Sequence, residues 1–267
     1  MLKSRISALL AAAVLLVAPA FVSAAGDAHL EDAQIDLQDK ASLQRGAGLF
    51  MNYCAACHSL QYMRYSRLAE DLELTPEQVE QFLIKGDAKI GEVMKTGIAK
   101  GDGQAWFGKA PPDLSTVARG KIGQEDWVYT FLKSFYVDEA RPMGWNNTVL
   151  ANASMPNVLW ELQGKQRKTE EGFVIQEHER GRLSEAEYDR AILDISAFLT
   201  YVGEPARLQR ESLGVWVILF LSFFTLLAYL LKNLVLRGGL LDGPGAWRFH
   251  ALHARYAAMK YRLLRGR

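Results

Sequence analysis

Cys54-Ala55-Ala56-Cys57-His58 is the stretch of this chain whose residue types and spacing specify a chemistry. Two thiols three positions apart can each add across one of the two vinyl groups of a single porphyrin. The histidine that follows the second thiol is then held beneath the ring, where an imidazole nitrogen can bind the iron. The motif therefore predicts one covalently attached haem c, with His58 as an axial ligand.

Other uses of Cys54 and Cys57 are weaker, because these are the only two cysteines in 267 residues. A zinc ribbon or finger needs a second cysteine pair or a histidine pair at finger spacing, which the sequence lacks. A thioredoxin-like dithiol would lie between a strand and a helix, whereas the residues before Cys54 have a helical pattern. A plain structural disulfide is the remaining alternative.

The second axial site of the iron decides what the haem does. An open site permits oxygen or peroxide chemistry, and a methionine thioether restricts the haem to electron transfer. Met51 and Met63 lie too near the motif in sequence to reach across the ring. Spacing alone does not choose among the other candidates, which are Met94, Met143, Met155, His29 and His178.

Two amphipathic helices are expected to position this motif. Residues 40–53 carry apolar side chains at helical spacing and lead directly into Cys54. Residues 184–202 show the same periodicity, and Ser184 and Glu187 form a capping box at their start. Such a pair is typical of a cytochrome c fold, in which the two terminal helices cross. Shorter helices are predicted from Pro76 to about Ile84, with Thr75 as N-cap, and over 124–135.

The segments between these helices are predicted to be mostly irregular. Residues 86–112 and 138–160 are rich in glycine, proline or asparagine, and loops of this length are often wrapped around a ligand. Residues 161–182 are polar around Phe173-Val174-Ile175, which indicates a small hairpin or an exposed excursion. The predicted class is mainly α: a cytochrome c-like haem domain with long loops and one C-terminal transmembrane helix.

Both ends of the chain carry hydrophobic runs. Residues 1–24 have Lys3 and Arg5, then a ten-residue apolar run and a small-residue cleavage site, which predicts a signal peptide. Leu213–Leu231 is an uncharged run that as a helix would span about 28 Å, one hydrocarbon core. A buried core helix, the alternative, would show a polar face. The predicted domains are a signal peptide (1–24), an exported haem domain (25–210), a membrane span (211–234) and a tail (235–267).

The balance of basic and acidic residues differs between the two sides of the predicted span. Residues 232–267 hold eight basic residues and one acidic residue, whereas residues 25–231 hold 21 basic and 29 acidic residues. A basic side normally faces the cytoplasm, so we expect an acidic periplasmic domain and a cytoplasmic tail on the inner membrane. The basic tail suits anionic lipid headgroups better than the phosphates of a nucleic acid.

The sequence resembles the cytochrome c1 family over most of its predicted mature length. The resemblance rests on several stretches in order: Arg45-Gly46 with Tyr53–Ser59, Ala110-Pro111-Pro112-Asp113-Leu114-Ser115, Glu125-Asp126, Met155-Pro156, and Phe198–Tyr201 with Glu204-Pro205 before the span. Each stretch except the haem motif is weak alone, and their joint order is specific. Two departures are Asn157 where the family often has a second proline, and the long basic tail.

The resemblance implies a role in a quinol-oxidising respiratory complex. Its haem would take single electrons from a Rieske iron–sulfur protein, beside a cytochrome b-type membrane subunit, and pass them to a soluble or tethered cytochrome c. It implies that Met155 is the sixth ligand and that Arg119 or Lys121 lies near a haem propionate. No independent catalytic reaction is expected of the chain. Alternatives are a tethered cytochrome serving a terminal oxidase, a haem peroxidase with an open sixth site, and a thiol–disulfide protein.

Overall fold

The computed structural model describes residues 29–233 and eight later positions (243, 245, 248, 249, 252, 255, 256 and 259). The predicted signal peptide and most of the predicted tail lie outside these residues. The chain divides into two units after Pro205, and we call residues 29–205 the head. The helices are α2 (Lys40–Tyr53), α3 (Tyr65–Asp71), α4 (Pro76–Phe82), α5 (Lys100–Phe107), α6 (Val117–Gly120), α7 (Gln124–Lys133), α8 (Trp160–Gln163), α9 (Glu185–Gly203) and α10 (Arg207–Leu231).

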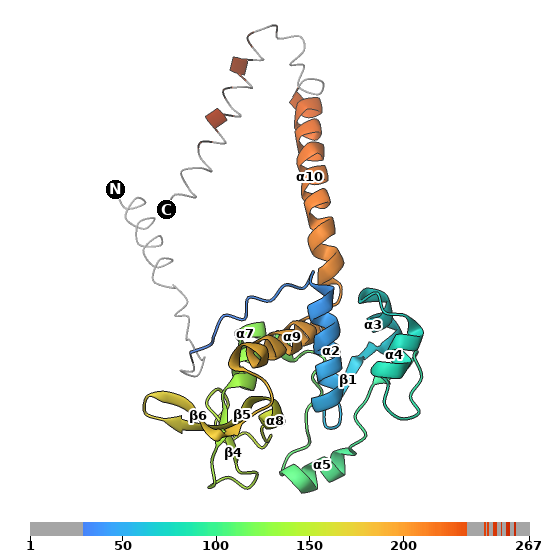
Figure 1. The fold of residues 1–267 in the computed structure, drawn as a ribbon. Coiled ribbons are helices and arrows are strands. Elements are labelled where there is room, and N and C mark those ends of the chain that lie inside the picture. Colours follow the sequence, from blue (N-terminus) through green and yellow to red (C-terminus); the bar gives the residue numbers. More distant parts are fainter. Residues whose placement is uncertain are drawn as a thin grey trace, which may run out of the picture. The chain divides into compact units, whose positions relative to one another are not determined.

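The head is organised around the packing of α2 against α9, which lie side by side in Figure 1. Gly46 permits this approach, because a Cβ atom at that position would lie 2.1 Å from the carbonyl oxygen of Asp194. Phe50 and Phe198 are both fully buried in the same interface. The two helices predicted from periodicity therefore form and pack on each other, as a cytochrome c fold requires.

Polar contacts close the same helix pair. The buried carboxylate of Asp194 accepts two hydrogen bonds from the Arg45 guanidinium, at 2.7 and 2.9 Å, and one from the Ser42 hydroxyl at 2.6 Å. A carboxylate this well paired avoids the large cost of burying an isolated charge. At the start of α9, Ser184 and Glu187 form the predicted capping box.

Three small antiparallel sheets accompany the helices. They pair β1 (Leu60–Arg64) with β2 (Val93–Met94), β3 (Phe135–Val137) with β4 (Trp145–Asn147), and β5 (Gly164–Thr169) with β6 (Gly172–Arg180). The last pair is the predicted hairpin around Phe173. Each of these sheets has two strands in the described part of the chain.

Two predictions were incomplete, one about an irregular segment and one about the end of a helix. Residues 86–112 contain the two-turn helix α5, although its sequence, KGDGQAWF, has low helix propensity. Gly108, at φ +72°, ends this helix, and Gly103 packs so closely on Pro111 that a Cβ atom would lie 2.7 Å from the ring. Tertiary packing thus overrides local propensity here. The predicted helix over 124–135 ends at Lys133, and Phe135 begins β3.

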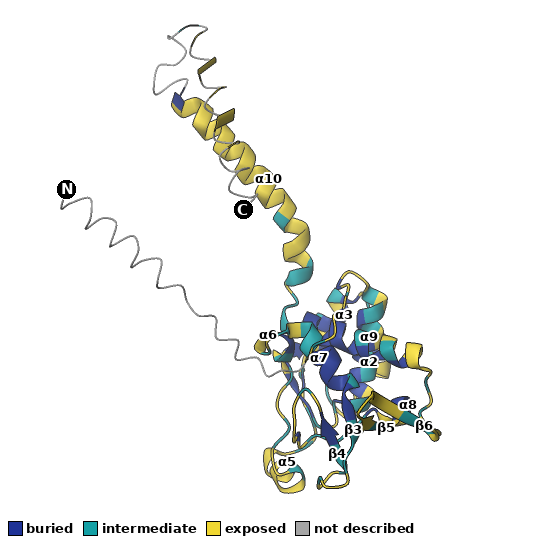
Figure 2. Cartoon of the chain, turned by 90° about the vertical axis from the view of Figure 1, so that its left-hand side faces the viewer, coloured by how far each residue is buried: buried dark blue, intermediate teal, exposed yellow. Residues whose placement is uncertain are grey.

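The C-terminal unit contains α10, a 25-residue helix with no buried residue and a mean hydropathy of 2.3 in its most apolar stretch. Figure 2 shows its surface as exposed along nearly the whole length. A helix this long and apolar has the length and composition of a membrane span, so the predicted transmembrane helix is confirmed in those terms. It begins at Arg207, nearly two turns before the uncharged run begins at Leu213.

Candidate haem site

The Cys54–His58 motif forms a tight turn at the C-terminal end of α2. The N–H of Cys54 donates to the carbonyl of Phe50 at 2.8 Å, which continues the helix by one bond. The N–H groups of Cys57 and His58 then both donate to the carbonyl of Cys54, at 3.0 and 2.9 Å. Main-chain bonds alone therefore bring the two thiols and the imidazole onto one turn.

The imidazole of His58 is oriented by a backbone group from a distant segment. Its Nδ1 lies 2.7 Å from the carbonyl oxygen of Pro112. Because a carbonyl only accepts, Nδ1 carries the proton and Nε2 keeps a free lone pair. Burial lowers the pKa of His58, an effect partly offset by the Pro112 hydrogen bond and the charge of Asp113. A neutral, oriented imidazole is the form that binds a haem iron.

Residues 112–115 are fixed against the motif by further contacts. The N–H of Leu114 donates to the carbonyl of Ser59 at 2.9 Å, and the Asp113 carboxylate accepts from the N–H of Gln61 at 2.9 Å. From the other side, the Thr96 hydroxyl donates to the carbonyl of Ala56 at 2.5 Å. We call this set, residues 54–61 with Thr96 and 112–114, the proximal frame.

A cavity of about 230 Å³ opens beside Cys57. Its walls come from three separate segments: Cys57, Ser59 and Gln61; Thr96, Ile98, Ala99 and Lys100; and Ala110, Pro111, Pro112 and Asp113. The Pro-Pro-Asp segment quoted for the family resemblance thus meets the Cys-His motif in space. Two adjacent thiols, an imidazole with a free Nε2 and a cavity at the second thiol fit a c-type haem.

The thiols do not have the character of a redox dithiol. Burial, together with the neighbouring Cys57, raises the pKa of Cys54 to about 12, and burial also raises the pKa of Cys57. Reactive Cys-X-X-Cys pairs have lowered thiol pKa values, usually at the N-terminus of a helix. Here the pair follows the C-terminal end of α2, and both cysteines are free thiols.

Met155 lies in the loop between β4 and α8 and is half-buried. It is not among the residues that line the cavity beside Cys57. Of the other candidates, Met94 is buried on β2 with Leu60 of β1 as its partner, and Met143 is 36% exposed on the loop after β3. His29 and His178 are exposed.

Buried side-chain amides hold the Met155 loop at both ends. Before Met155, the Oδ1 of Asn147 accepts from the N–H groups of Val149 and Leu150, at 2.9 and 3.0 Å. After it, the Oδ1 of Asn157 accepts from the N–H of Leu159 at 3.0 Å. With Gln163 and Gln166, these residues form what we call the amide frame.

Sequence analysis missed the amide frame and Thr96. Asparagine two residues before a backbone N–H that it can cap is a recognised turn former, so Met155-Pro156-Asn157 carried a local signal. No local signal marks the contacts of Gln163, Gln166 and Thr96 with segments that are distant in sequence.

Arg119 and Lys121, predicted near a propionate, lie on or just after α6 and outside the cavity lining. The guanidinium of Arg119 is 3.9 Å from the carboxylate of Glu204. The ammonium of Lys121 lies 4.4 Å from the centre of the Trp127 ring. Their assignment to a propionate stays a prediction.

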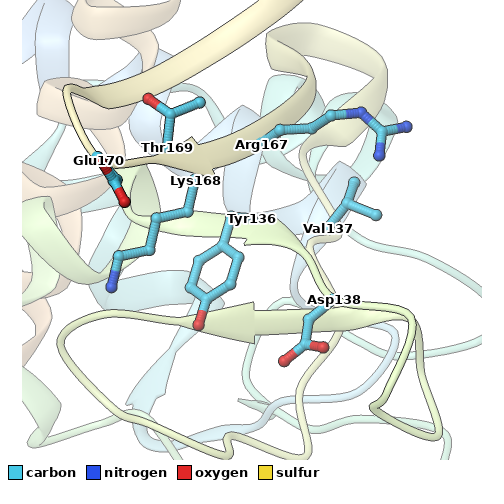
Figure 3. A pocket seen from close by; sticks show the side chains of 7 residues that line it. All are labelled: Tyr136, Val137, Asp138, Arg167, Lys168, Thr169 and Glu170. Carbon is cyan, nitrogen blue, oxygen red and sulfur yellow. The ribbon is translucent and has the colours of Figure 1, made fainter.

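A second, larger depression lies elsewhere on the head (Figure 3). It has a volume of about 820 Å³ and is formed by Tyr136, Val137 and Asp138 with Arg167, Lys168, Thr169 and Glu170. Arg167 is paired with Glu179 at 2.9 Å, and the Lys168 ammonium lies 5.7 Å from the Tyr136 ring. No residue is common to this depression and the cavity beside Cys57.

Comparison with known proteins relates this chain to one family and to several individual proteins. The model of the Cytochrome C1 family matches residues 31–238. Cytochrome c1 of Allochromatium vinosum is 49% identical over 84% of this chain and 96% of the relative. The ammonia monooxygenase gamma subunit of Nitrosomonas europaea is 38% identical over 82% of this chain and 93% of the relative. The mitochondrial cytochrome c1 haem protein of Saccharomyces cerevisiae is 28% identical over 73% and 66%.

Proposed function

This chain belongs to the cytochrome c1 family, and from that premise we propose that it is the membrane-anchored haem subunit of a quinol-oxidising respiratory complex. When bound, haem c supplies an iron that takes up and releases one electron at a time. The residues of this chain attach the haem, orient its ligands and hold it in the head. The observation that carries the proposal is the family match over residues 31–238, and the 2.7 Å contact between Nδ1 of His58 and the carbonyl of Pro112 supports the haem ligation within it.

Cys54 and Cys57 attach one haem covalently. Each sulfur would form a bond to a vinyl carbon, and the thiol hydrogen would pass to the neighbouring carbon, so the addition would need no oxidant. Both thiols lie on the turn that also carries His58, which supports attachment and ligation at a single group. The Nε2 of His58 would bind the haem iron, because Nδ1 is engaged by Pro112.

Met155 is the sixth ligand in this proposal. A thioether in that position excludes oxygen and peroxide and leaves electron transfer as the only activity. Support comes from the place of Met155 before a proline in a loop that is held at both ends. Arg119 or Lys121 is proposed to lie near a propionate.

The proposed topology follows the four predicted segments. Residues 1–24 direct export and are removed, 25–210 form the periplasmic haem domain, 211–234 span the membrane and 235–267 remain in the cytoplasm. The length and hydropathy of α10 support the span, and the basic excess after it supports the orientation. The tail would then lie against the anionic inner leaflet.

The proposed partners are a cytochrome b-type subunit and a Rieske iron–sulfur protein within the complex, and a cytochrome c as the acceptor. Between residues 25 and 231 acidic residues outnumber basic ones by 29 to 21. Such a surface attracts a basic carrier at a rate that falls as salt rises. An unchanged turnover rate between low and high salt would contradict this steering.

The decisive experiment uses the full chain purified from membranes in detergent. A covalent-haem stain on the denatured chain should be positive. The oxidised protein should show the weak absorption band of methionine bound to haem iron, which Met155→Leu should abolish while lowering the reduction potential. Met143→Leu is the matched control, since Met143 lies on an exposed loop of the same head. A wild-type protein without the band would favour an open sixth site.

A further inference from the structure

The loop that carries Met155 is tied to the rest of the head through Asn157, which is only 2% exposed. Pro156 alone separates the two residues, and its fixed φ leaves the backbone little freedom between them. The position of Asn157 therefore limits where Met155 can lie.

Asn157 makes two hydrogen bonds in different directions. Its Oδ1 accepts from the N–H of Leu159 at 3.0 Å, which shapes the local turn. Its Nδ2 donates to the Oε1 of Gln163 at 3.0 Å, which connects the turn to α8. A serine could keep the first bond but is too short to keep the second.

The connection continues from Gln163 into the core. The Nε2 of Gln163 donates to the carbonyl of Lys133 at 3.2 Å and to the Oε1 of Gln166 at 3.2 Å. The Nε2 of Gln166 donates to the carbonyls of Lys133 and Phe135, at 3.1 and 2.9 Å. Lys133 is the last residue of α7, where helix carbonyls have no intrahelical donor.

We propose that Asn157 is a positioning residue for the haem. Through Gln163 and Gln166, it ties the loop that carries Met155 to the backbone carbonyl at the C-terminal end of α7. The inference rests on the proposed function, because it assumes that Met155 is the iron ligand. It gives a physical account of Asn157 in this chain: the amide link restrains the loop after Met155-Pro156. A buried chain of amides is rigid only when each donor and acceptor is paired, so one break loosens the loop.

The test compares variants of the full-length holoprotein by absorption and reduction potential. Asn157→Leu keeps the branched shape of the side chain and removes both bonds, and should weaken the methionine-to-iron band and lower the potential. Asn157→Ser keeps the turn and should produce the same change to a smaller extent, which covers the case in which the leucine variant does not fold. Asn152→Gly is the matched control, because it removes an exposed amide from the same loop at a φ of +62° that glycine accepts.

Amide hydrogen exchange provides a readout independent of electron transfer. Loss of the bond to Asn157 should speed exchange of the Leu159 N–H about fivefold in Asn157→Leu, and much less in Asn157→Ser. Gln163→Met should weaken the band as Asn157→Ser does. The double variant Asn157→Ser/Gln163→Met should be no worse than Gln163→Met alone, since Gln163→Met has already broken the bond that Asn157→Ser removes.

The outcomes separate this inference from the proposed function. If Met155→Leu has the same spectrum as wild type, Met155 is not the ligand and the proposed ligation fails. If Met155→Leu loses the band but the Asn157 variants keep both band and potential, Asn157 is only a structural residue and the inference is overturned.

Discussion

The proximal frame and the amide frame hold their candidate ligands in different ways. Around His58 the decisive groups belong to the main chain: the carbonyls of Cys54 and Pro112, and the N–H of Leu114. Around Met155 they are side-chain amides, chiefly those of Asn147 and Asn157. A substitution cannot remove a backbone carbonyl but can remove an amide. Substitutions should therefore disturb the His58 side only where they remove the thiols or the helix packing. On the Met155 side, a substitution that removes a single hydrogen bond should be enough.

The largest effect is expected from removing the thiols themselves. Cys54→Ala/Cys57→Ala leaves no sulfur to bond the porphyrin, so the denatured chain should lose its haem stain completely. The stain in gels of the full-length protein measures this. Met155→Leu, which alters the other side, should keep the stain at full strength. A stained double variant would contradict attachment through these two thiols.

The second effect concerns the helix that carries the motif. A methyl group at Gly46 would meet the carbonyl of Asp194, so Gly46→Ala should lower the free energy of unfolding by about 3 kcal/mol, as overpacking does. Gly48 has open space around its Cα, so Gly48→Ala should raise it by about 0.5–1 kcal/mol. Denaturant unfolding followed by circular dichroism distinguishes them. Equal behaviour of the two variants would contradict the close crossing.

On the amide side, the strongest single effect is expected at Asn147. Its Oδ1 accepts from two backbone N–H groups and from the Ser134 hydroxyl, and its Nδ2 donates to the carbonyl of Phe131 at 2.8 Å. Asn147→Ala should cost about 2 kcal/mol of unfolding free energy, because it leaves buried polar groups unpaired. Ser154→Ala, an exposed change on the same loop, should be neutral. If Asn147→Ala lowers the free energy of unfolding no more than Ser154→Ala does, Asn147 does not stabilise the loop as proposed.

The smallest effect tests whether side chains matter on the proximal side. Thr96→Val deletes the hydroxyl that donates to Ala56 but keeps the Thr96 N–H bond to Ser59. We expect a loss of about 1 kcal/mol and an unchanged methionine-to-iron band, measured by unfolding and absorption. Thr148→Val, at an exposed loop position, is the control. A weakened band in Thr96→Val would mean that the two frames are not as different as their contacts suggest.

Sequence alone predicted the features that depend on local pattern. The periodicity of α2 and α9, the N-cap at Thr75, the capping box at Ser184, the hairpin around Phe173 and the length of α10 all correspond to observed elements. Each is encoded within a few residues of its own position. The Cys-His motif is local in the same sense, since main-chain bonds of one turn assemble it.

Features that depend on distant partners were not predictable from pattern. Helix α5 forms in a glycine-containing segment because Pro111 packs on Gly103. The carbonyl of Pro112 orients an imidazole 54 residues away. Gln163 and Gln166 can hold the loop only because α7 ends where their side-chain amides can donate to the carbonyl of Lys133. No periodicity or spacing in the sequence indicates these contacts between distant segments.

The packing of α2 on α9 also determines the order of events during folding. Arg45 and Asp194, which meet there, are 149 positions apart, and a ribosome makes the first long before the second. Until α9 exists, α2 has no surface to pack on, and Cys54, buried in the finished head, stays open to reagents. Contacts between residues so far apart in sequence also form late during folding. Before α9 packs on α2, Cys54 is therefore more accessible to a large planar group than it is in the finished head.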